Sequence, residues 1–296
     1  MRPGGRQVMG RNKGESPSME ENAKRGYLHE DFRLFHIRDQ VELELNYHYH
    51  EFNKVVIFLS GSVTYVVEGK AYFLQPWDIL LVPHGQIHRP IIDPGEPYER
   101  IILWMNSDFL ALHSDADGDL LQCFRLAQER KFALIRLDAS ARPELRRMLD
   151  GLEDALRSTE FGHSLLARTG FLQLMIALNR MALRDATSLD TETYRSDPKV
   201  EEILSYINAN LDADLSLDAI AGRFYISKSY LMHRFKELTG CSAHKYVRQK
   251  RLLWAAEMIR EGVPVIEASQ RCGFGDYSAF LRAFKQVFGV TPSEIG

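Results

Sequence analysis

The sequence predicts an α+β protein with a β-rich N-terminal domain and an all-α C-terminal domain. Between about residues 32 and 105, short runs rich in Val, Ile, Tyr and Phe alternate with turn residues, which is typical of an antiparallel β-sandwich or barrel. From about Ser107 the apolar residues recur at helical spacing instead. The last third of the chain contains one helix-turn-helix pattern twice. A chain of 296 residues is long enough for about two domains.

The N-terminal part of the chain divides into a polar leader and a β-domain. Residues 1–26 are rich in Gly, Arg, Asn and Ser, have almost no large apolar side chains and are predicted to be disordered, with Met19 as an alternative start. Residues 27–106 are predicted to form an antiparallel β-barrel, because apolar runs from FRLFHI to ERIILWM follow one another without helical segments between them. Turn sequences such as Asp93-Pro94-Gly95 separate the runs.

Residues 107–186 are predicted to form a helical segment that makes a dimer. The helix within ARPELRRMLDGLEDALRS has one apolar face, whereas the helix within SLLARTGFLQLMIALNRMAL is apolar nearly all round. A helix of the second kind must be covered on several sides, by its own domain or by a second copy of the chain. We expect a homodimer on this basis. The polar residues 187–198 are predicted to be the interdomain linker.

Composition excludes several classes of protein. Hydrophobic residues make up 45% and charged residues 26% of the chain, which is typical of a soluble globular protein. No apolar run approaches the roughly 18 residues of a membrane helix, and the N-terminus lacks the apolar core of a secretory signal. The three widely spaced cysteines fit neither a disulfide framework nor a zinc site. We therefore expect a cytoplasmic protein without membrane contact.

Charge is distributed unevenly along the chain. The net charge is −3, but residues 219–296 contain twelve Lys and Arg against six acidic residues, a balance of +6, so that the rest of the chain carries −9. A basic tail on an acidic body indicates that the tail alone binds a polyanion.

Residues 199–296 are predicted to bind DNA through two helix-turn-helix units, at about 216–238 and 265–288. The second helices align on Phe235-Lys236 and Phe284-Lys285. In each second helix, two apolar residues four positions apart pack against the first helix, and the opposite face remains polar and free to enter a major groove. The connecting helix of about 17 residues, roughly 25 Å long, can place the two units in successive major grooves, about 34 Å apart.

A set of residues in the two units and the connecting helix forms a pattern that resembles a known family. In the first unit and the connecting helix these are Leu217, Ala221, Phe224, Ser227, Tyr230, Leu231, Phe235, Lys236, Gly240, Tyr246, Arg251 and Leu252, and in the second unit they are Gly273, Phe274, Asp276, Ser278, Phe280, Arg282, Phe284, Lys285, Gly289 and Pro292. With these residues the segment resembles the DNA-binding domain of AraC/XylS-type transcription regulators. Ala268-Ser269 stands where that family usually has an Ile-Ala pair, which predicts looser packing of the second unit.

Twelve residues of the two second helices are predicted to contact DNA. The small polar residues at the helix starts reach phosphates or base edges, the long polar side chains read bases, and the lysines that follow the buried Phe residues sit near the backbone. They are Ser227, Lys228, Ser229, Tyr230, His233, Arg234 and Lys236 in the first unit and Asp276, Tyr277, Ser278, Arg282 and Lys285 in the second.

The β-domain carries His48-x-His50 and, later, Pro83-x-Gly85-x-x-His88, a pattern that resembles the two cupin motifs. The resemblance implies a small-molecule effector site at His48, His50, His88 and Trp77. In metal cupins such histidines and a glutamate bind a divalent ion, but Asn53-Lys54 stands where the glutamate is expected. A metal bound by the three histidines, a metal-free ligand pocket and purely structural histidines all remain as interpretations.

The combined resemblance implies a sequence-specific transcription regulator that binds double-stranded promoter DNA and responds to a small-molecule effector. It is expected to have no catalytic activity and no cofactor, and RNA polymerase is a further candidate partner. An alternative from another class is a metal-dependent cupin enzyme with a helical appendage. A third is a DNA-binding adaptor whose β-domain only dimerises. The missing carboxylate and the complete pair of helix-turn-helix units favour the regulator.

Overall fold

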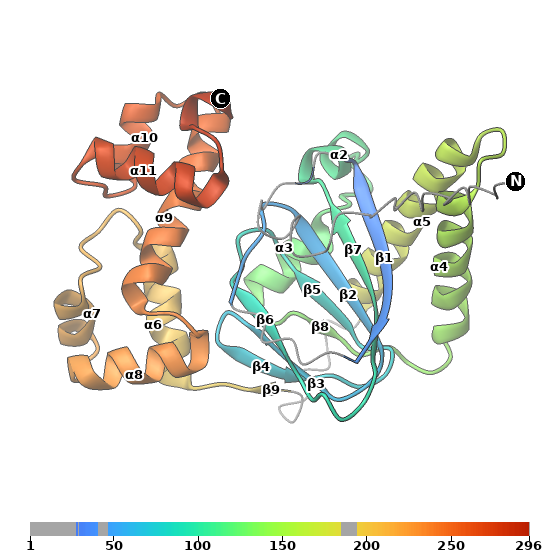
Figure 1. The fold of residues 1–296 in the computed structure, drawn as a ribbon, viewed down its shortest axis with the longest axis horizontal. Coiled ribbons are helices and arrows are strands. Elements are labelled where there is room, and N and C mark those ends of the chain that lie inside the picture. The colour runs from blue at the N-terminus through green and yellow to red at the C-terminus, as the bar shows by residue number, and fades with distance from the viewer. Residues whose placement is uncertain (1–27, 29, 41–46, 185–193, 296) are drawn as a thin grey trace, which may run out of the picture.

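The structure is a computed structural model that describes residues 28, 30–40, 47–184 and 194–295. It confirms the predicted α+β class, with an antiparallel β-domain followed by helices and an all-α C-terminal domain (Figure 1). The predicted leader and residues 187–193 of the predicted linker lie outside the described residues. Among those described, no helix is both long and apolar enough to cross a membrane.

Two antiparallel sheets pack face to face in the β-domain. The larger sheet has the strand order β1-β7-β2-β5-β8 and the smaller sheet the order β6-β3-β4-β9. The strands are β1 (Phe32–Asp39), β2 (Asn53–Ser60), β3 (Val63–Val67), β4 (Lys70–Phe73), β5 (Ile79–Val82), β6 (His88–Ile92), β7 (Tyr98–Met105), β8 (Leu134–Ile135) and β9 (Tyr194–Arg195).

The central strands are buried on both faces, which explains their unbroken apolar runs. In β2, Val55 and Ile57 pack toward the helices, whereas Val56 and Phe58 pack between the two sheets. Alternate residues of a strand point to opposite faces, so a strand covered on both sides needs apolar residues at every position. The larger sheet is therefore the middle layer of the domain, between the smaller sheet and the helices.

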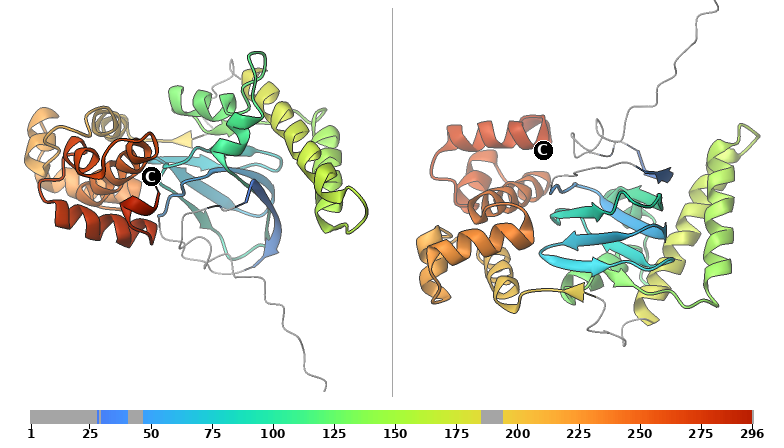
Figure 2. Two further views of the ribbon diagram at one scale, coloured as in Figure 1. Left: turned by 90° about the horizontal axis from the view of Figure 1, so that it is seen from above. Right: turned by 60° about the horizontal axis from the view of Figure 1, so that its bottom comes forward.

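Helices cover the outer face of the larger sheet. They are α2 (Ser107–Leu112), α3 (Gln122–Glu129), α4 (Arg142–Arg157) and α5 (His163–Arg184), and Figure 2 shows the strands between the α4–α5 pair and the C-terminal domain. β8 arises within residues 107–186, which the sequence predicts as helical, and pairs with β5. β9 arises at the end of the predicted linker and pairs with β4. Strands of two residues are too short to show a period of two in the sequence.

The C-terminal domain consists of six α-helices and a short 3₁₀ turn within the described residues. They are α6 (Pro198–Ala209), α7 (Leu217–Arg223), α8 (Lys228–Thr239), α9 (Ala243–Arg260), α10 (Val265–Arg271), α11 (Tyr277–Phe288) and η3 (Pro292–Glu294). Helices α7 and α8 form the first helix-turn-helix unit, called unit 1 below, and α10 and α11 form unit 2. Helix α9 connects the units and has 18 residues, which corresponds to about 27 Å.

The two units repeat the same backbone geometry. The residue after each first helix is followed by one in the left-handed conformation, Tyr225 with φ 53° in unit 1 and Gly273 with φ 73° in unit 2. The next amide bonds back to the first helix, from Ile226 N to Ala221 O and from Phe274 N to Ser269 O. Both second helices also end in a left-handed glycine. The repeat predicted from sequence is therefore a structural repeat.

Unit 2 does not show the looser packing that Ala268 predicts. Ala268 is fully buried, and the rings of Phe280, Phe284 and Phe288 pack in sequence, with centroid distances of 5.5 and 4.2 Å between neighbours. Phe274 closes the cluster against Phe280 at 5.2 Å. Ala268 thus belongs to one buried cluster with the aromatic side chains of its own unit.

Candidate nucleic-acid interface and effector site

The second helices of both units begin on the side of the C-terminal domain that faces away from the sheets (Figure 1). Side chains cap both starts: the Ser227 hydroxyl accepts from Tyr230 N at 3.1 Å, and the Asp276 carboxylate accepts from Ser278 N at 2.8 Å. Of the twelve predicted DNA-contacting residues, eleven are exposed and Arg234 is half-buried. The structure thus exposes nearly all the predicted residues, and the starts of both second helices lie on the same side of the domain.

Two of the predicted DNA-contacting cations of unit 1 are already paired with acidic residues of the protein. Arg234 donates from Nε to Asp197 Oδ2 at 2.8 Å and from Nη1 to Glu237 Oε2 at 2.9 Å. Asp197 is also the N-cap of α6, 37 residues earlier in the chain. Partial burial raises the pKa of Asp197, but the bond from Arg234 and those from the α6 amides outweigh it and lower that pKa. Lys228 forms an ion pair with Asp218.

The arginine on the second helix of unit 2 is less constrained. Arg282 has its nearest acidic oxygen, Asp276 Oδ2, at 3.9 Å, and both side chains are exposed. This distance is outside hydrogen-bond range, so the guanidinium is available for a bidentate contact with a base.

Tyr225 is an exposed residue beside the predicted DNA-contacting residues of unit 1, and the sequence analysis missed it. Its side chain is 96% exposed, in the turn that leads into α8, and its backbone has the left-handed conformation that costs a non-glycine residue energy. The signal lies in the repeat: aligning the turns at an offset of 48, instead of the 49 that aligns the second helices, pairs Tyr225 with Gly273.

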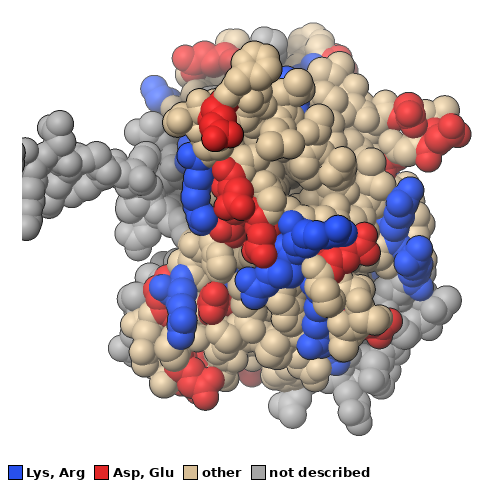
Figure 3. Space-filling model, turned by 90° about the vertical axis from the view of Figure 1, so that its right-hand side faces the viewer, with Lys and Arg blue, Asp and Glu red and all other residues tan. Residues whose placement is uncertain are grey.

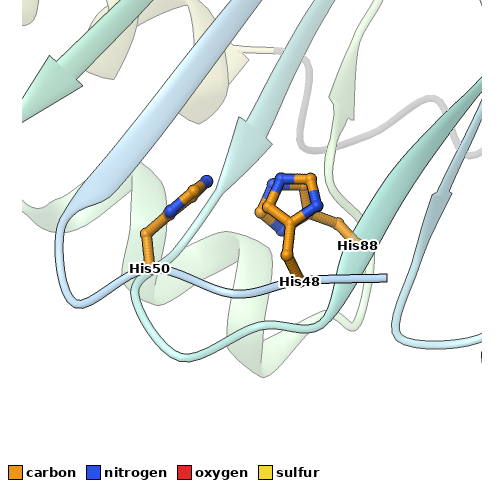
Figure 4. A group of neighbouring side chains, drawn as sticks. All are labelled: His48, His50 and His88. Atoms are coloured by element: carbon orange, nitrogen blue, oxygen red, sulfur yellow. The ribbon is translucent and has the colours of Figure 1, made fainter. Parts of the chain in front are cut away.

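Three of the four predicted effector-site residues lie together inside the β-domain. His48 and His50 project from one extended segment and His88 from the adjoining strand β6 (Figure 4). The ring centroids are 4.4 Å apart for His48 and His88, 4.9 Å for His48 and His50, and 5.2 Å for His50 and His88. Trp77 does not join them, because it packs in the apolar cluster between the larger sheet and the helices.

A buried lysine completes the histidine cluster. Lys54 Nζ donates to the Tyr65 hydroxyl at 2.9 Å and lies 3.4 Å from His88 Nε2. Burial, followed by the nearby charge of Arg100, lowers the pKa of Lys54 to about 7. Burial is also the main cause that lowers the pKa values of His50 and His88 well below their usual range, so both imidazoles are neutral at pH 7.

The cluster fits a metal-free site better than a cupin metal centre. The potential ligand atoms of the three histidines lie within 4.8 Å of one another, and neutral imidazoles are good ligands. Among the described residues, however, no carboxylate joins this group. The Lys54 amine, from the position where the sequence lacks a glutamate, approaches His88 Nε2. Within the part of the chain that the structure describes, His50 Nδ1 and Trp104 Nε1 are buried without a hydrogen-bond partner.

A cavity of about 1050 Å³ lies between the β-domain and the C-terminal domain. The β-domain contributes Glu68, Lys70 and Lys131 to its lining, and the C-terminal domain contributes Glu201, Lys250 and Trp254. Polar contacts cross it: Lys250 donates to Glu68 at 2.8 Å, and Lys131 donates to Ser205 at 2.7 Å. The two domains are thus in direct contact around the cavity.

The side of the molecule that bears α4 and α5 has broad uncharged areas between its charged clusters (Figure 3). One side of α5 packs on the larger sheet through residues that include Phe171, Leu174 and Leu178. The other side leaves large apolar residues exposed, and a further one precedes the helix. They are Phe161, Leu165, Leu166, Ile176 and Leu183.

Comparison with known proteins extends over both domains. Residues 34–175 match the family model of the AraC-like ligand binding domain, and residues 220–295 match that of a helix-turn-helix domain. The HTH-type transcriptional activator RhaS of Enterobacter sp. (strain 638) is 24% identical over 84% of this chain and 86% of its own length. RhaS of Salmonella schwarzengrund (strain CVM19633) is 23% identical over the same shares. Among solved structures, the C-terminal domain of AraT, a response regulator from Geobacillus stearothermophilus, has 29% identity and covers 33% of this chain and 84% of its own, with a TM-score of 0.33.

Proposed function

The chain belongs to the AraC family of transcription regulators, and from that premise we propose that it binds promoter DNA with both helix-turn-helix units at once. The observation that carries the proposal is the repeated geometry: α8 and α11 are capped alike, begin on one face and are connected by a single helix of 18 residues. A helix of about 27 Å between the two units can set them in successive major grooves, which are about 34 Å apart.

The proposed contacts divide into two kinds. The capped helix starts and the exposed Lys236 and Lys285 hold the DNA backbone. His233, Tyr277 and Arg282 are exposed on the second helices and read bases. Arg234 is held by Asp197 and Glu237, so it fixes the position of α8 and contributes less to base recognition than the sequence predicts.

The proposed effector site is the histidine cluster inside the β-domain. His50, His88 and Lys54 are buried polar groups, and His50 Nδ1 and the neighbouring Trp104 Nε1 have no hydrogen-bond partner among the described residues. A small molecule with oxygen atoms would satisfy these groups. We propose a regulator without catalytic activity. The cupin-enzyme alternative is less favoured, since Lys54 replaces the carboxylate ligand.

We also propose that the regulator acts in the cytoplasm as a homodimer through α5. The exposed leucines on the outer side of this helix would be buried against the same helix of a second copy. Sedimentation of the full chain tests this proposal. We expect the wild type to be a dimer at micromolar concentration and Leu165→Glu/Leu166→Glu to be a monomer. Arg146→Glu, on the exposed face of α4, is the matched control and stays dimeric. The two RhaS relatives named above are transcriptional activators, so RNA polymerase at the promoter is included as a proposed partner.

The DNA-binding proposal is tested by selecting duplexes from a random library with the full chain and footprinting the enriched sequence. We expect two protected segments about 10 base pairs apart for each bound chain. Lys236→Ala/Lys285→Ala should weaken binding, whereas Arg146→Ala should not. Selection that enriches no sequence would contradict the proposal.

A further inference from the structure

Residues 47–51 form an extended segment whose two faces serve different domains. Successive side chains of an extended chain point in opposite directions. Here His48 and His50 point into the β-domain, and Tyr47, Tyr49 and Glu51 contact the C-terminal domain. The alternation has no interruption: the next residue, Phe52, is buried between the two sheets.

The inner face is fixed to the β-domain by backbone hydrogen bonds. His48 and His88 exchange two of them, from His48 N to His88 O at 3.1 Å and from His88 N to His48 O at 2.9 Å. Gly85 N donates to His50 O at 2.8 Å. The His50 ring stacks on Phe52, with centroids 4.4 Å apart. A histidine side chain of the cluster can therefore change position only by adopting another rotamer or by moving this backbone.

The outer face reaches both helix-turn-helix units. The Tyr47 ring lies against Gly240, the left-handed residue that ends α8, so closely that a Cβ there would have no room, and its hydroxyl donates to Leu238 O at 3.4 Å. Tyr49 packs against the apolar cores of both units. Glu51 forms an ion pair with Arg260, the last residue of α9, directly before unit 2.

The adjoining strand has the same two-faced arrangement. His88 is fully buried in the histidine cluster, and its neighbour Ile87 is buried in the core of unit 1. Two adjacent chain segments thus carry a histidine of the cluster on one side and an apolar contact of the C-terminal domain on the other. In each segment, the inner and the outer side chains belong to neighbouring positions of the chain.

We propose that residues Tyr47–Glu51 transmit the state of the histidine cluster to both helix-turn-helix units, so that a change of His48 or His50 inside the β-domain alters DNA affinity. The inference rests on the proposed function and specifies how its effector site is connected to the DNA-binding face. The coupling follows from geometry: the two units are held by Tyr47 at the end of α8 and by Glu51 at the end of α9.

The test is a double-mutant cycle in the full chain, read as the Kd for the duplex selected from the random library. His50→Ala should change this Kd at least fivefold, the lower end of typical allosteric coupling. In the background Tyr47→Ser/Glu51→Gln, which removes outer contacts and leaves the histidines in place, the same substitution should change the Kd less than twofold. An unchanged effect of His50→Ala in that background would overturn the proposal.

Phe58→Leu is the matched control for a general disturbance of the β-domain. Phe58 is fully buried between the two sheets but belongs to β2, not to the segment. It should change the Kd less than twofold, and an effect equal to that of His50→Ala would also overturn the proposal. If thermal unfolding shows that His50→Ala does not fold, His48→Gln takes its place.

A second readout separates failure of the coupling from failure of the proposed function, because it needs no DNA. Amide hydrogen exchange should be faster at residues 236–241 and 257–261 in His50→Ala and unchanged there in Phe58→Leu. If the wild type selects no DNA, the proposed function fails, and the exchange pattern still decides whether the segment connects the domains. Equal exchange in wild type and His50→Ala would overturn the coupling.

Discussion

Unit 1 and unit 2 have nearly the same backbone but very different surroundings. Both turns pass through a left-handed residue, and both second helices are capped at the start and end. Unit 1 is held by Tyr47 at the end of α8 and by Asp197 at Arg234. Unit 2 contacts the β-domain through Tyr49, and its entry is held by the pair of Glu51 and Arg260. The repeated sequence thus determines the backbone geometry of each unit, whereas residues elsewhere in the chain determine which contacts hold each unit in place.

The turns show how a neighbour selects the residue at one backbone position. In unit 2, Arg251 of α9 donates to Gly273 O at 3.0 Å, and a Cβ on Gly273 would lie 2.7 Å from the guanidinium. The equivalent position in unit 1 is open, so it accepts the exposed side chain of Tyr225. Glycine is required in one turn and merely favoured in the other.

The largest expected effect tests whether the two units are equally well packed. Phe235 and Phe284 are both fully buried at equivalent positions. Each change to Ala should lower the free energy of unfolding of the C-terminal domain by about 3–5 kcal/mol, because each leaves a cavity of similar size. Urea unfolding followed by circular dichroism measures this. If the loss for Phe284→Ala is less than half of that for Phe235→Ala, unit 2 is less tightly packed than unit 1, as Ala268 predicts.

The next effect concerns which arginine reads DNA. Arg282 has no acceptor within hydrogen-bond distance among the described residues, whereas Arg234 is bonded to Asp197 and Glu237. Arg282→Ala should therefore cost about 1–3 kcal/mol of specific binding, the value of a good bidentate contact. Arg234→Ala should cost less on the same duplex at fixed salt. The opposite order, measured by fluorescence anisotropy, would show that Arg234 leaves its acidic partners on DNA.

Substitutions in the two turns are expected to change the free energy of unfolding by smaller amounts and in opposite directions. Tyr225→Gly should raise the free energy of unfolding by about 1 kcal/mol, because it relieves a left-handed non-glycine residue. Gly273→Ala should lower it, since the added Cβ meets Arg251. If Tyr225 also touches DNA, the more stable Tyr225→Gly protein binds the selected duplex more weakly. Thermal unfolding and anisotropy on one preparation separate the two effects, and destabilisation by Tyr225→Gly would refute the strain argument.

The sequence predicts those features that depend on neighbours along the chain. The apolar runs of β2, β5 and β7, the helix caps Ser227 and Asp276 and the repeat of the two units all depend on local patterns. The histidine cluster can also be predicted in part from the sequence, because His48 and His50 are alternate residues of one extended segment and point to the same side.

The features that the sequence does not predict depend on distant contacts. The pairing of Arg234 with Asp197 joins residues 37 positions apart, and nothing in the polar face of α8 signals it. Trp77 has φ 75°, a turn conformation that places its ring on the helix side of the larger sheet, away from the histidines. The outward contacts of Tyr47 and Glu51 depend on how the two domains meet, which no local period encodes.

The smallest expected effect compares Lys236 and Lys285, which follow the buried Phe of each unit and are both exposed. Each lysine that neutralises one phosphate releases about one counterion, so each change to Ala should reduce the slope of log K against log salt by about one unit. The reduction should be the same on selected and random duplexes, because a phosphate contact carries no sequence information. Arg146→Ala, on α4, should leave the slope unchanged. A change of slope for one lysine alone would mean that only its unit touches the backbone, and that the shared geometry of the two units does not bring both to DNA together.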